Sequence, residues 1–154
     1  MDELKRWRAE QAARYLEDVR GKALRVKSLT LAIAEQRGIA EGLRGMDYSR
    51  DIVKTSPTDA ALPNAVHRLQ ELIAEKEAVR ADYAADIACA YRAIDSIEKA
   101  EHAAALEMHY LGGESWSKCA AELGYTKSGM MDLRQRALID FYDCMPRTKI
   151  DAFK

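Results

Sequence analysis

Two glycine-containing breaks in the stretch 103–145 constrain this chain more than any other feature. A helix is predicted to end at the double glycine Gly112–Gly113, and a short helix with the sequence SWSKCAAEL follows. A turn at Gly124–Tyr125 then leads into a second helix that begins near Thr126. Two helices of this length joined by a glycine-containing turn are typical of a helix-turn-helix.

Polar caps and apolar spacings indicate the same two helices. Ser115 or Ser117 is suited to cap the first helix, and Thr126 the second, because their side-chain oxygens accept bonds from free backbone N–H groups. Apolar residues spaced three or four apart lie on one face of a helix. This spacing predicts a shared core of Leu106, Tyr110, Trp116, Cys119, Ala120, Leu123, Met130, Leu133, Ala137, Leu138 and Phe141.

The composition of the chain favours the all-α class. Of its 154 residues, 48% are hydrophobic and 32% are charged, so we expect a folded core and not a disordered chain. Ala, Leu, Glu, Lys and Arg dominate, and these residues have the highest helix propensities. No run of 18 apolar residues occurs, and the charged start MDELKRWRAE is unlike a signal peptide. We therefore expect a cytoplasmic protein with no membrane partner.

Two long helices are predicted over about 2–46 and 64–95, with a connector over 46–63 that is rich in turn-forming residues. The first carries an apolar stripe of Ala12, Leu16, Val19, Ala23, Val26, Thr30 and Ile33. The second carries one of Leu69, Leu72, Ile73, Val79, Tyr83, Ile87, Ala90, Tyr91 and Ile94. We expect the two helices to pair as a long antiparallel, coiled-coil-like hairpin, which forms a first domain over 1–95. Such a hairpin leaves apolar surface uncovered, which predicts a homo-oligomer with a dimer favoured.

A third helix, from about Ser96 to Leu111, is predicted to open a second domain over 96–154. Glu98, Glu101 and His102 are expected together on its solvated face. Glu98 and His102 are spaced to share that face, but a metal site needs several converging ligands and no third one is evident. We therefore predict no metal site.

The sequence contains no motif that indicates an enzyme. We find no glycine-rich phosphate loop, no nucleophile elbow and no metal-binding signature. The three cysteines have no CxxC spacing, so neither a disulfide framework nor a zinc site is indicated, and each is expected to act as a small hydrophobic residue. They are Cys89, Cys119 and Cys144. We therefore expect no catalytic residues and no cofactor.

The run YLGGESWSKCAAELGYTKSGMMDLRQRALIDF resembles region 4 of the bacterial sigma factors. It is more similar to the small phage-encoded regulators of the RinA and ArpU type, which carry the same sigma-like fold. The connector VKTSPTDAALPNAV and the helix QELIAEKEAVRADYAADI occur in a similar order in those regulators. The resemblance covers roughly residues 12–145, with its specific part over 106–141. It implies a DNA-binding transcriptional regulator of phage genes, located in the cytoplasm of the bacterial host.

The resemblance also implies which residues contact DNA. The helix from Lys127 to about Phe141 would be the recognition helix, whose first turns enter the major groove of double-stranded DNA while the preceding helix crosses the backbone. In this reading Arg134 and Arg136 flank the DNA backbone, and the other residues face bases or nearby phosphates. The full set of implied DNA-binding residues is Thr126, Lys127, Ser128, Met131, Asp132, Arg134, Gln135 and Arg136.

Two alternative functions remain open because the predicted recognition helix is weakly basic. Lys127 is the only cation in its first turn, Asp132 repels phosphate, and the net charge of the chain is −1. The sigma-like fold could instead be a protein-binding module that docks on RNA polymerase or on another regulator. The chain could also be a small terminase-like DNA-packaging subunit, since those proteins combine a helix-turn-helix with long helices that assemble into a ring.

Overall fold

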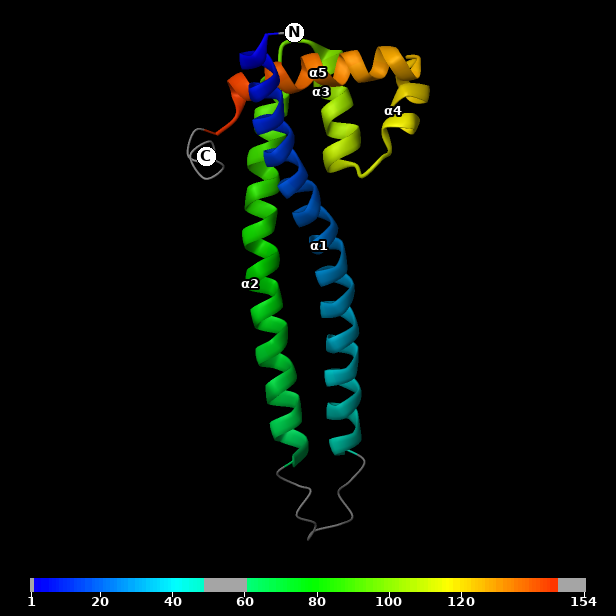
Figure 1. Ribbon diagram of the computed structural model, residues 1–154. Coiled ribbons are helices and arrows are strands. Elements are labelled where there is room, and N and C mark those ends of the chain that lie inside the picture. The colour runs from blue at the N-terminus through cyan, green and yellow to red at the C-terminus, as the bar shows by residue number, and fades with distance from the viewer. Residues whose placement is uncertain (1, 49–60, 147–154) are drawn as a thin grey trace. The chain divides into compact units, whose positions relative to one another are not determined.

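The computed structural model describes residues 2–48 and 61–146, and every regular element in these two ranges is a helix. Figure 1 shows α1 (Glu3–Tyr48), α2 (Ala61–Asp95), α3 (Ala100–Leu106), η2 (Glu107–Leu111), α4 (Trp116–Leu123) and α5 (Lys127–Cys144). The element η2 is a short π-helix that continues directly from α3. None of the described helices is both long enough and apolar enough to cross a membrane. The predicted all-α class is confirmed for this part of the chain.

The two long helices have somewhat different bounds from those predicted. Helix α1 spans Glu3–Tyr48 instead of 2–46, and α2 begins at Ala61 instead of 64. Pro63 therefore lies in the first turn of α2. Proline is tolerated there because the first N–H groups of a helix have no intrahelical partner. Most of the predicted connector lies outside the described residues.

The third helix begins later than predicted, at Ala100 and not at Ser96. The Ser96 hydroxyl donates a hydrogen bond of 2.7 Å to the backbone carbonyl three residues earlier, at the end of α2. Lys99 then has an extended backbone, with φ −82° and ψ 110°, immediately before α3. Glu98 consequently lies outside the helix. The predicted helical face shared by Glu98 and His102 does not form.

The chain divides into two compact units, at places that differ from the predicted domain boundary between 95 and 96. One unit joins Met1–Leu24 to Ala84–Lys154, and the other is Arg25–Tyr83. The first unit extends across the predicted boundary because the start of α1 and the end of α2 share a core with the C-terminal helices. The long helices therefore support the predicted helix-turn-helix segment directly.

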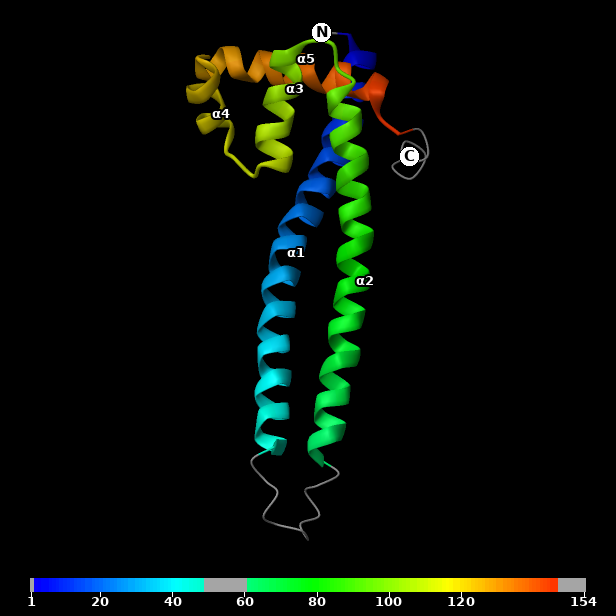
Figure 2. The same cartoon turned by 180° about the vertical axis from the view of Figure 1, so that it is seen from behind.

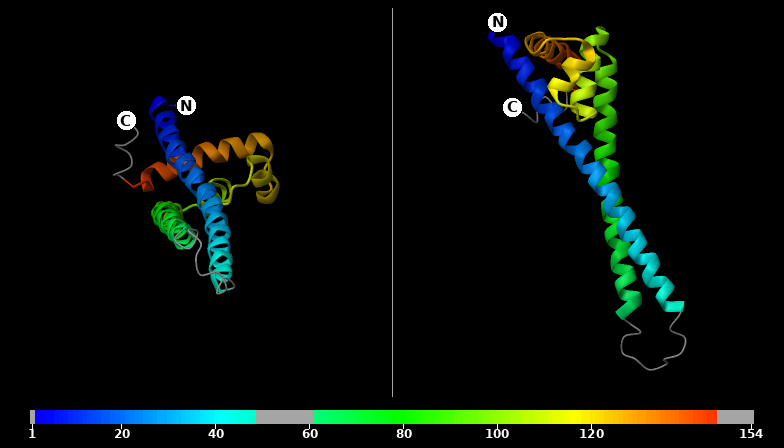
Figure 3. Two further views of the ribbon diagram at one scale, coloured as in Figure 1. Left: turned by 90° about the horizontal axis from the view of Figure 1, so that it is seen from below. Right: turned by 90° about the vertical axis from the view of Figure 1, so that its right-hand side faces the viewer.

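The core of the first unit is formed by side chains from both ends of the chain. Helix α5 crosses the first half of α1 in this unit (Figure 3). At the crossing, the rings of Tyr15 and Phe141 lie 5.7 Å apart, and those of Trp7 and Tyr142 lie 5.6 Å apart. The largest fully buried side chains of this core are Leu16, Val19, Ile94, Leu106, Tyr110 and Phe141.

The second unit is a helical hairpin made of the α1 and α2 segments within Arg25–Tyr83. The two segments run antiparallel, as Figures 1 and 2 show from opposite sides. Arg37 of α1 forms an ion pair with Glu77 of α2, and the Arg80 guanidinium donates a hydrogen bond of 3.4 Å to Thr30 Oγ1. These contacts set the register of the hairpin. Its buried residues are Leu29, Ile33, Ala40 and Ile73.

The predicted stripe of α1 is partly wrong. Ala12, Leu16, Val19 and Ile33 are buried as predicted, and Ala23 and Val26 are half-buried. Thr30 is exposed, and its hydroxyl donates a hydrogen bond of 2.8 Å to the carbonyl of Val26. The neighbouring Leu29 is buried in its place.

The predicted stripe of α2 was too wide. Ile73, Ala90 and Ile94 are buried as predicted, but Leu72, Val79 and Tyr91 remain 37%, 40% and 38% exposed. Adjacent residues on a helix project about 100° apart, so Leu72 and Ile73 cannot both face the same partner helix. Leu72 and Val79 form the edge of a separate stripe.

Candidate functional site

Helix α4 lies between a serine cap and a glycine turn. The Ser115 hydroxyl accepts a hydrogen bond of 3.2 Å from the backbone N–H of Lys118, so Ser115 is the cap of the two predicted serines. At the other end Gly124 has φ 75° and ψ 29°, a left-handed conformation that glycine adopts without steric cost. The N–H of Tyr125 then donates to the carbonyl of Ala120 at 2.8 Å. These bonds fix where α4 stops and where the chain turns.

Helix α5 begins at the predicted threonine cap. The Thr126 hydroxyl accepts a hydrogen bond of 3.1 Å from the backbone N–H of Gly129. A Cβ added to Gly129 would lie only 3.1 Å from Thr126 Oγ1 and 3.5 Å from Tyr125 Cδ1. This close packing accounts for a residue of low helix propensity in the first turn of α5, because a larger side chain would crowd the cap.

The apolar face of α5 is the one that its spacing predicts. Met130, Leu133, Ala137, Leu138 and Phe141 are all buried. Met130 and Leu133 pack with residues of α3 and α4 in a small cluster beneath the turn, and Leu138 and Phe141 belong to the larger core. The cluster beneath the turn consists of Ala105, Cys119, Ala120, Met130 and Leu133, with Trp116 and Leu123 half-buried against it.

Most of the predicted DNA-binding residues are exposed. Thr126, Lys127, Ser128, Met131, Asp132 and Arg136 are exposed, whereas Arg134 and Gln135 are half-buried. Among the exposed residues, Arg136 is next to Asp132, with its Nε 3.4 Å from the Asp132 carbonyl oxygen. The first turn of α5 contains no acidic residue. Six of the eight predicted residues are thus accessible to a ligand.

Arg134 has a structural role that the sequence did not indicate. Its guanidinium lies over the Trp116 ring, 5.3 Å from the centroid, in the geometry of a cation–π contact. Tyr110 is buried close to the same guanidinium. Burial raises the pKa of the Tyr110 hydroxyl, and the positive charge of Arg134 acts in the opposite direction. Arg134 of α5 therefore packs on Trp116 of α4 and is not a freely exposed cation.

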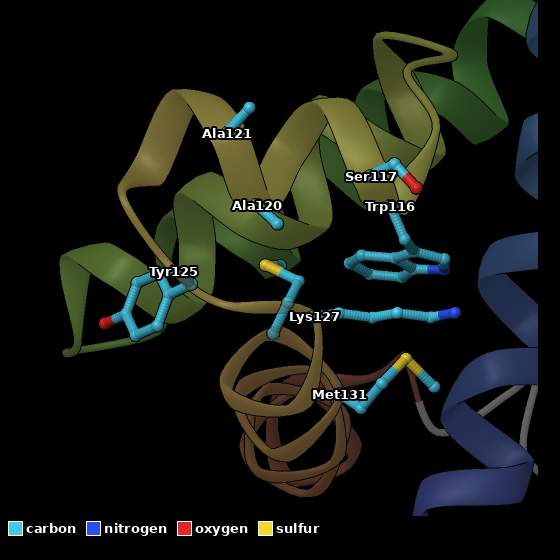
Figure 4. A pocket seen from close by; sticks show the side chains of 8 residues that line it. Trp116, Ser117, Ala120, Ala121, Tyr125, Lys127 and Met131 are labelled. Carbon is cyan, nitrogen blue, oxygen red and sulfur yellow. The ribbon is translucent and has the colours of Figure 1, made fainter.

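A groove of about 300 Å³ separates the exposed sides of α4 and α5. Figure 4 shows the Lys127 side chain extended between the Trp116 ring and the Met131 side chain. Met131 remains 46% exposed and Lys127 is also exposed. The groove thus combines an apolar wall with one cation. Its other lining residues are Ser117, Ala120, Ala121, Tyr125 and Met130.

A second groove, of about 490 Å³, separates α5 from the start of α1. The α1 side presents Arg6 and Glu10, and the α5 side presents Asp132 and Gln135. Sequence reasoning missed this neighbour because the two segments are more than a hundred residues apart. A ligand that approaches the middle of α5 therefore also meets charged side chains of α1.

His109 connects η2 to α1 and α4 within the first unit. It is 4% exposed, and its ring stacks on Trp116 with centroids 4.0 Å apart. Its Nδ1 lies 2.6 Å from the backbone carbonyl of Glu114, and its Nε2 lies 3.1 Å from the guanidinium of Arg20. A carbonyl only accepts and a guanidinium only donates, so the neutral ring carries its proton on Nδ1. Burial lowers the pKa of His109, which favours this neutral form.

His102 was predicted on a solvated helix face, and this prediction is wrong. The residue is 4% exposed, and its Nδ1 lies 2.5 Å from the Asp140 carboxylate of α5. His102 of α3 thus faces α5, and of the predicted group only Glu101 stays exposed on α3. The carboxylate of Glu101 accepts a hydrogen bond of 2.6 Å from the Tyr125 hydroxyl, which raises the pKa of that hydroxyl.

The described residues contain no group of three or more His, Cys, Asp or Glu side chains placed to hold a metal ion. The cysteines are free thiols, exposed at Cys89, buried at Cys119 and half-buried at Cys144. Each cysteine was expected to act as a small hydrophobic residue, and Cys89 is the one that lies exposed at the surface. No protein-family model, curated protein or solved structure matches the chain. A function has to be inferred from the residues of the chain itself.

Proposed function

We propose that this chain is a transcriptional regulator that reads the major groove of double-stranded DNA with the first turns of α5. The observation that carries the proposal is the capped α4–turn–α5 unit, in which the buried core leaves the start of α5 accessible. Recognition helices of this class present their N-terminal residues to base edges. Here those residues are Thr126, Lys127, Ser128 and Met131, all of them exposed.

Electrostatics support an anionic ligand at this end of α5. The N-terminus of a helix carries a partial positive charge and unpaired N–H groups, which favour phosphate. Lys127 adds a full positive charge in the same turn, and no acidic residue opposes it there. Arg136 of α5 and Arg6 of α1 are further exposed cations of the same unit. Asp132 lies farther along α5, where its carboxylate is suited to accept a bond from a cytosine amino group.

The resemblance to phage regulators of the RinA and ArpU type supports the biological setting. We propose that the chain acts in the cytoplasm of a bacterial host as a regulator of phage genes and that it functions as a homo-oligomer. A dimer doubles the number of phosphate contacts, which compensates for the low positive charge of a single recognition helix.

A protein-binding module is the second candidate, and the groove between α4 and α5 favours it. Trp116, Met130 and Met131 give this groove an apolar wall, and Met and aromatic side chains are common in surfaces that bind other proteins. In this alternative the partner is RNA polymerase or another regulator, and Lys127 pairs with an acidic residue of that partner. A small terminase-like subunit is a third candidate, which predicts a ring of many copies.

Selection of bound fragments from the parent genome, followed by a salt titration on the selected duplex, tests the proposal. We expect the logarithm of the binding constant to fall linearly with the logarithm of the salt concentration. Lys127→Ala should weaken binding and reduce that slope by roughly one if Lys127 contacts a phosphate. Lys27→Ala is the matched control, because Lys27 is also exposed on a helix but lies in the other unit.

Three results would contradict DNA reading by α5. They are the absence of any selected fragment, an affinity that is independent of salt, and an equal loss of affinity in the Lys127 and Lys27 variants. Capture of RNA polymerase without DNA binding would favour the protein-binding alternative instead.

A further inference from the structure

The helical hairpin within Arg25–Tyr83 has a polar side and an apolar side. On the polar side lie the ion pair of Arg37 with Glu77 and a groove that is also lined by Gln70. Each polar residue is followed, two positions later, by an apolar one. Ile39 follows Arg37, Leu72 follows Gln70, and Val79 follows Glu77. Two positions on a helix correspond to a rotation of about 200°, so the three apolar side chains project to the other side.

The three apolar residues lie within about two helical turns of one another along the hairpin. Ile39, Leu72 and Val79 are 49%, 37% and 40% exposed. In the antiparallel register set by Arg37 and Glu77, Ile39 lies level with residue 75, between Leu72 and Val79. Single exposed apolar residues are ordinary on a protein surface, but a contiguous group on two neighbouring helices indicates an interaction surface.

Along α2, charged residues continue the same stripe. Arg68, Leu72, Glu75, Val79 and Asp82 follow one another at spacings of four, three, four and three residues, which keeps them on one face. All five are exposed, and among the described residues neither Arg68 nor Asp82 forms an ion pair. This face, which we call the α2 stripe, is separate from the one that packs on α1.

The α2 stripe is complementary to itself in the antiparallel direction. A two-fold axis through Glu75 places Arg68 of one copy level with Asp82 of the other, since each lies seven residues from the axis. The same operation places Leu72 of one copy level with residue 78 of the other, next to Val79. Arg68 and Asp82 also lie at similar angles around the helix. In an antiparallel pair, Arg68 of one copy and Asp82 of the other therefore lie on the same flank of the interface. The two charges can therefore meet across the interface.

We infer that the α2 stripe binds a second copy of this chain, with the two α2 helices packed antiparallel about Glu75. Leu72, Val79 and the nearby Ile39 of both copies form the apolar centre, and two Arg68–Asp82 pairs close its ends. The two Glu75 carboxylates meet at the axis, where like charges oppose the contact. The inference rests on the proposed function only in that it specifies the interface of the homo-oligomer proposed there. It does not depend on DNA reading, because it involves no residue of α4 or α5.

Sedimentation equilibrium of the full chain without DNA tests the inference. We expect a reversible monomer–dimer equilibrium. Arg68→Glu should raise the dimer Kd by roughly tenfold or more at low salt, because it places two acidic residues together at each end. The double variant Arg68→Glu, Asp82→Arg should restore the Kd. Glu75→Gln should lower the Kd, because it removes the repulsion at the axis.

Arg44→Glu is the matched control, since Arg44 is an exposed arginine on the polar side of the same hairpin. It should leave the dimer Kd unchanged, and circular dichroism should show that every variant keeps its helix content. A monomer at all concentrations, a ring of many copies, or a dimer equally sensitive to Arg44→Glu and Arg68→Glu would overturn the inference. Failure of the double variant to restore the Kd would overturn it as well.

The outcome is distinguishable from that of the DNA experiment. Lys127→Ala should leave the dimer Kd unchanged, because Lys127 lies outside the hairpin unit. If the chain dimerises as described but selects no DNA, the DNA proposal fails alone. If it binds DNA but the α2 stripe variants leave the Kd unchanged, this inference fails alone.

Discussion

The imidazole ring of His109 lies against the indole of Trp116, with centroids 4.0 Å apart and ring planes inclined by 20°. This stack joins η2 to the first residue of α4. The guanidinium of Arg134 of α5 also lies over the indole, 5.3 Å from the ring centroid. Trp116 thus connects the two helices of the candidate recognition unit to the helix that precedes them. A change in the charge of His109 should therefore affect the stability of the whole unit.

Acidification should destabilise the protein through His109. Burial lowers the pKa of this residue below its ordinary value of 6.5. The unfolded chain therefore takes up the proton at a higher pH than the folded one, and the stabilisation is complete only above pH 6.5. We expect the free energy of unfolding, measured with urea, to fall as the pH drops below this value. The contribution of His109 continues to decrease until the pH reaches its folded-state pKa.

His109→Gln should flatten this pH dependence, because glutamine keeps a donor for the Glu114 carbonyl but does not titrate. His67→Gln is the matched control, since the His67 side chain is 70% exposed. An equal flattening in both variants would argue against the role of His109, as would an unchanged slope in His109→Gln.

Arg134→Ala should destabilise the fold, although sequence reasoning placed this residue only against the DNA backbone. Loss of the contact with Trp116 is expected to cost about 1–2 kcal/mol, the range for a partly desolvated cation–π pair. Arg136→Ala, at an exposed position two residues later, should change the stability by no more than about 0.5 kcal/mol. Thermal and urea unfolding of both variants measure the difference, and equal stabilities would refute the structural role of Arg134.

Leu133→Ala should cost about 2–5 kcal/mol of stability, because it leaves a cavity beneath the α4–α5 turn. Leu133 is 2% exposed in the cluster with Cys119 and Met130. Met131→Ala removes a comparable apolar side chain from the exposed face and should cost much less. Urea unfolding is the measurement, and if the two variants lost the same stability, the assignment of the two faces of α5 would be incorrect.

Two glycine-to-alanine substitutions should act in opposite directions. Gly124 has a positive φ of 75°, where a Cβ is strained, so Gly124→Ala should lower the stability by roughly 1 kcal/mol. Gly21 lies inside α1 with open space around the position of a Cβ. Gly21→Ala should raise the stability by about 0.5–1 kcal/mol, because alanine has the higher helix propensity. Differential scanning calorimetry should therefore show opposite shifts in Tm, and shifts of the same sign would contradict the explanation.

Local sequence determined the helices of the candidate site and their buried faces. The cap at Thr126 and the turn at Gly124 depend on residues within a few positions, and both are confirmed. The apolar spacing of Met130, Leu133 and Phe141 likewise predicts a single buried face for α5. These features could be predicted because they depend on backbone conformation and on the period of a helix, which neighbouring residues control.

Only the tertiary structure decided which polar side chains became buried and which apolar ones stayed exposed. His102 and Arg134 lie on helices whose sequence pattern suits a solvated position, yet Asp140 and Trp116 provide partners from other helices. Conversely, Leu72 remains exposed because α1 covers only one side of α2. Burial depends on which surfaces meet across long separations in the chain, and a periodic pattern within one helix does not specify that partner.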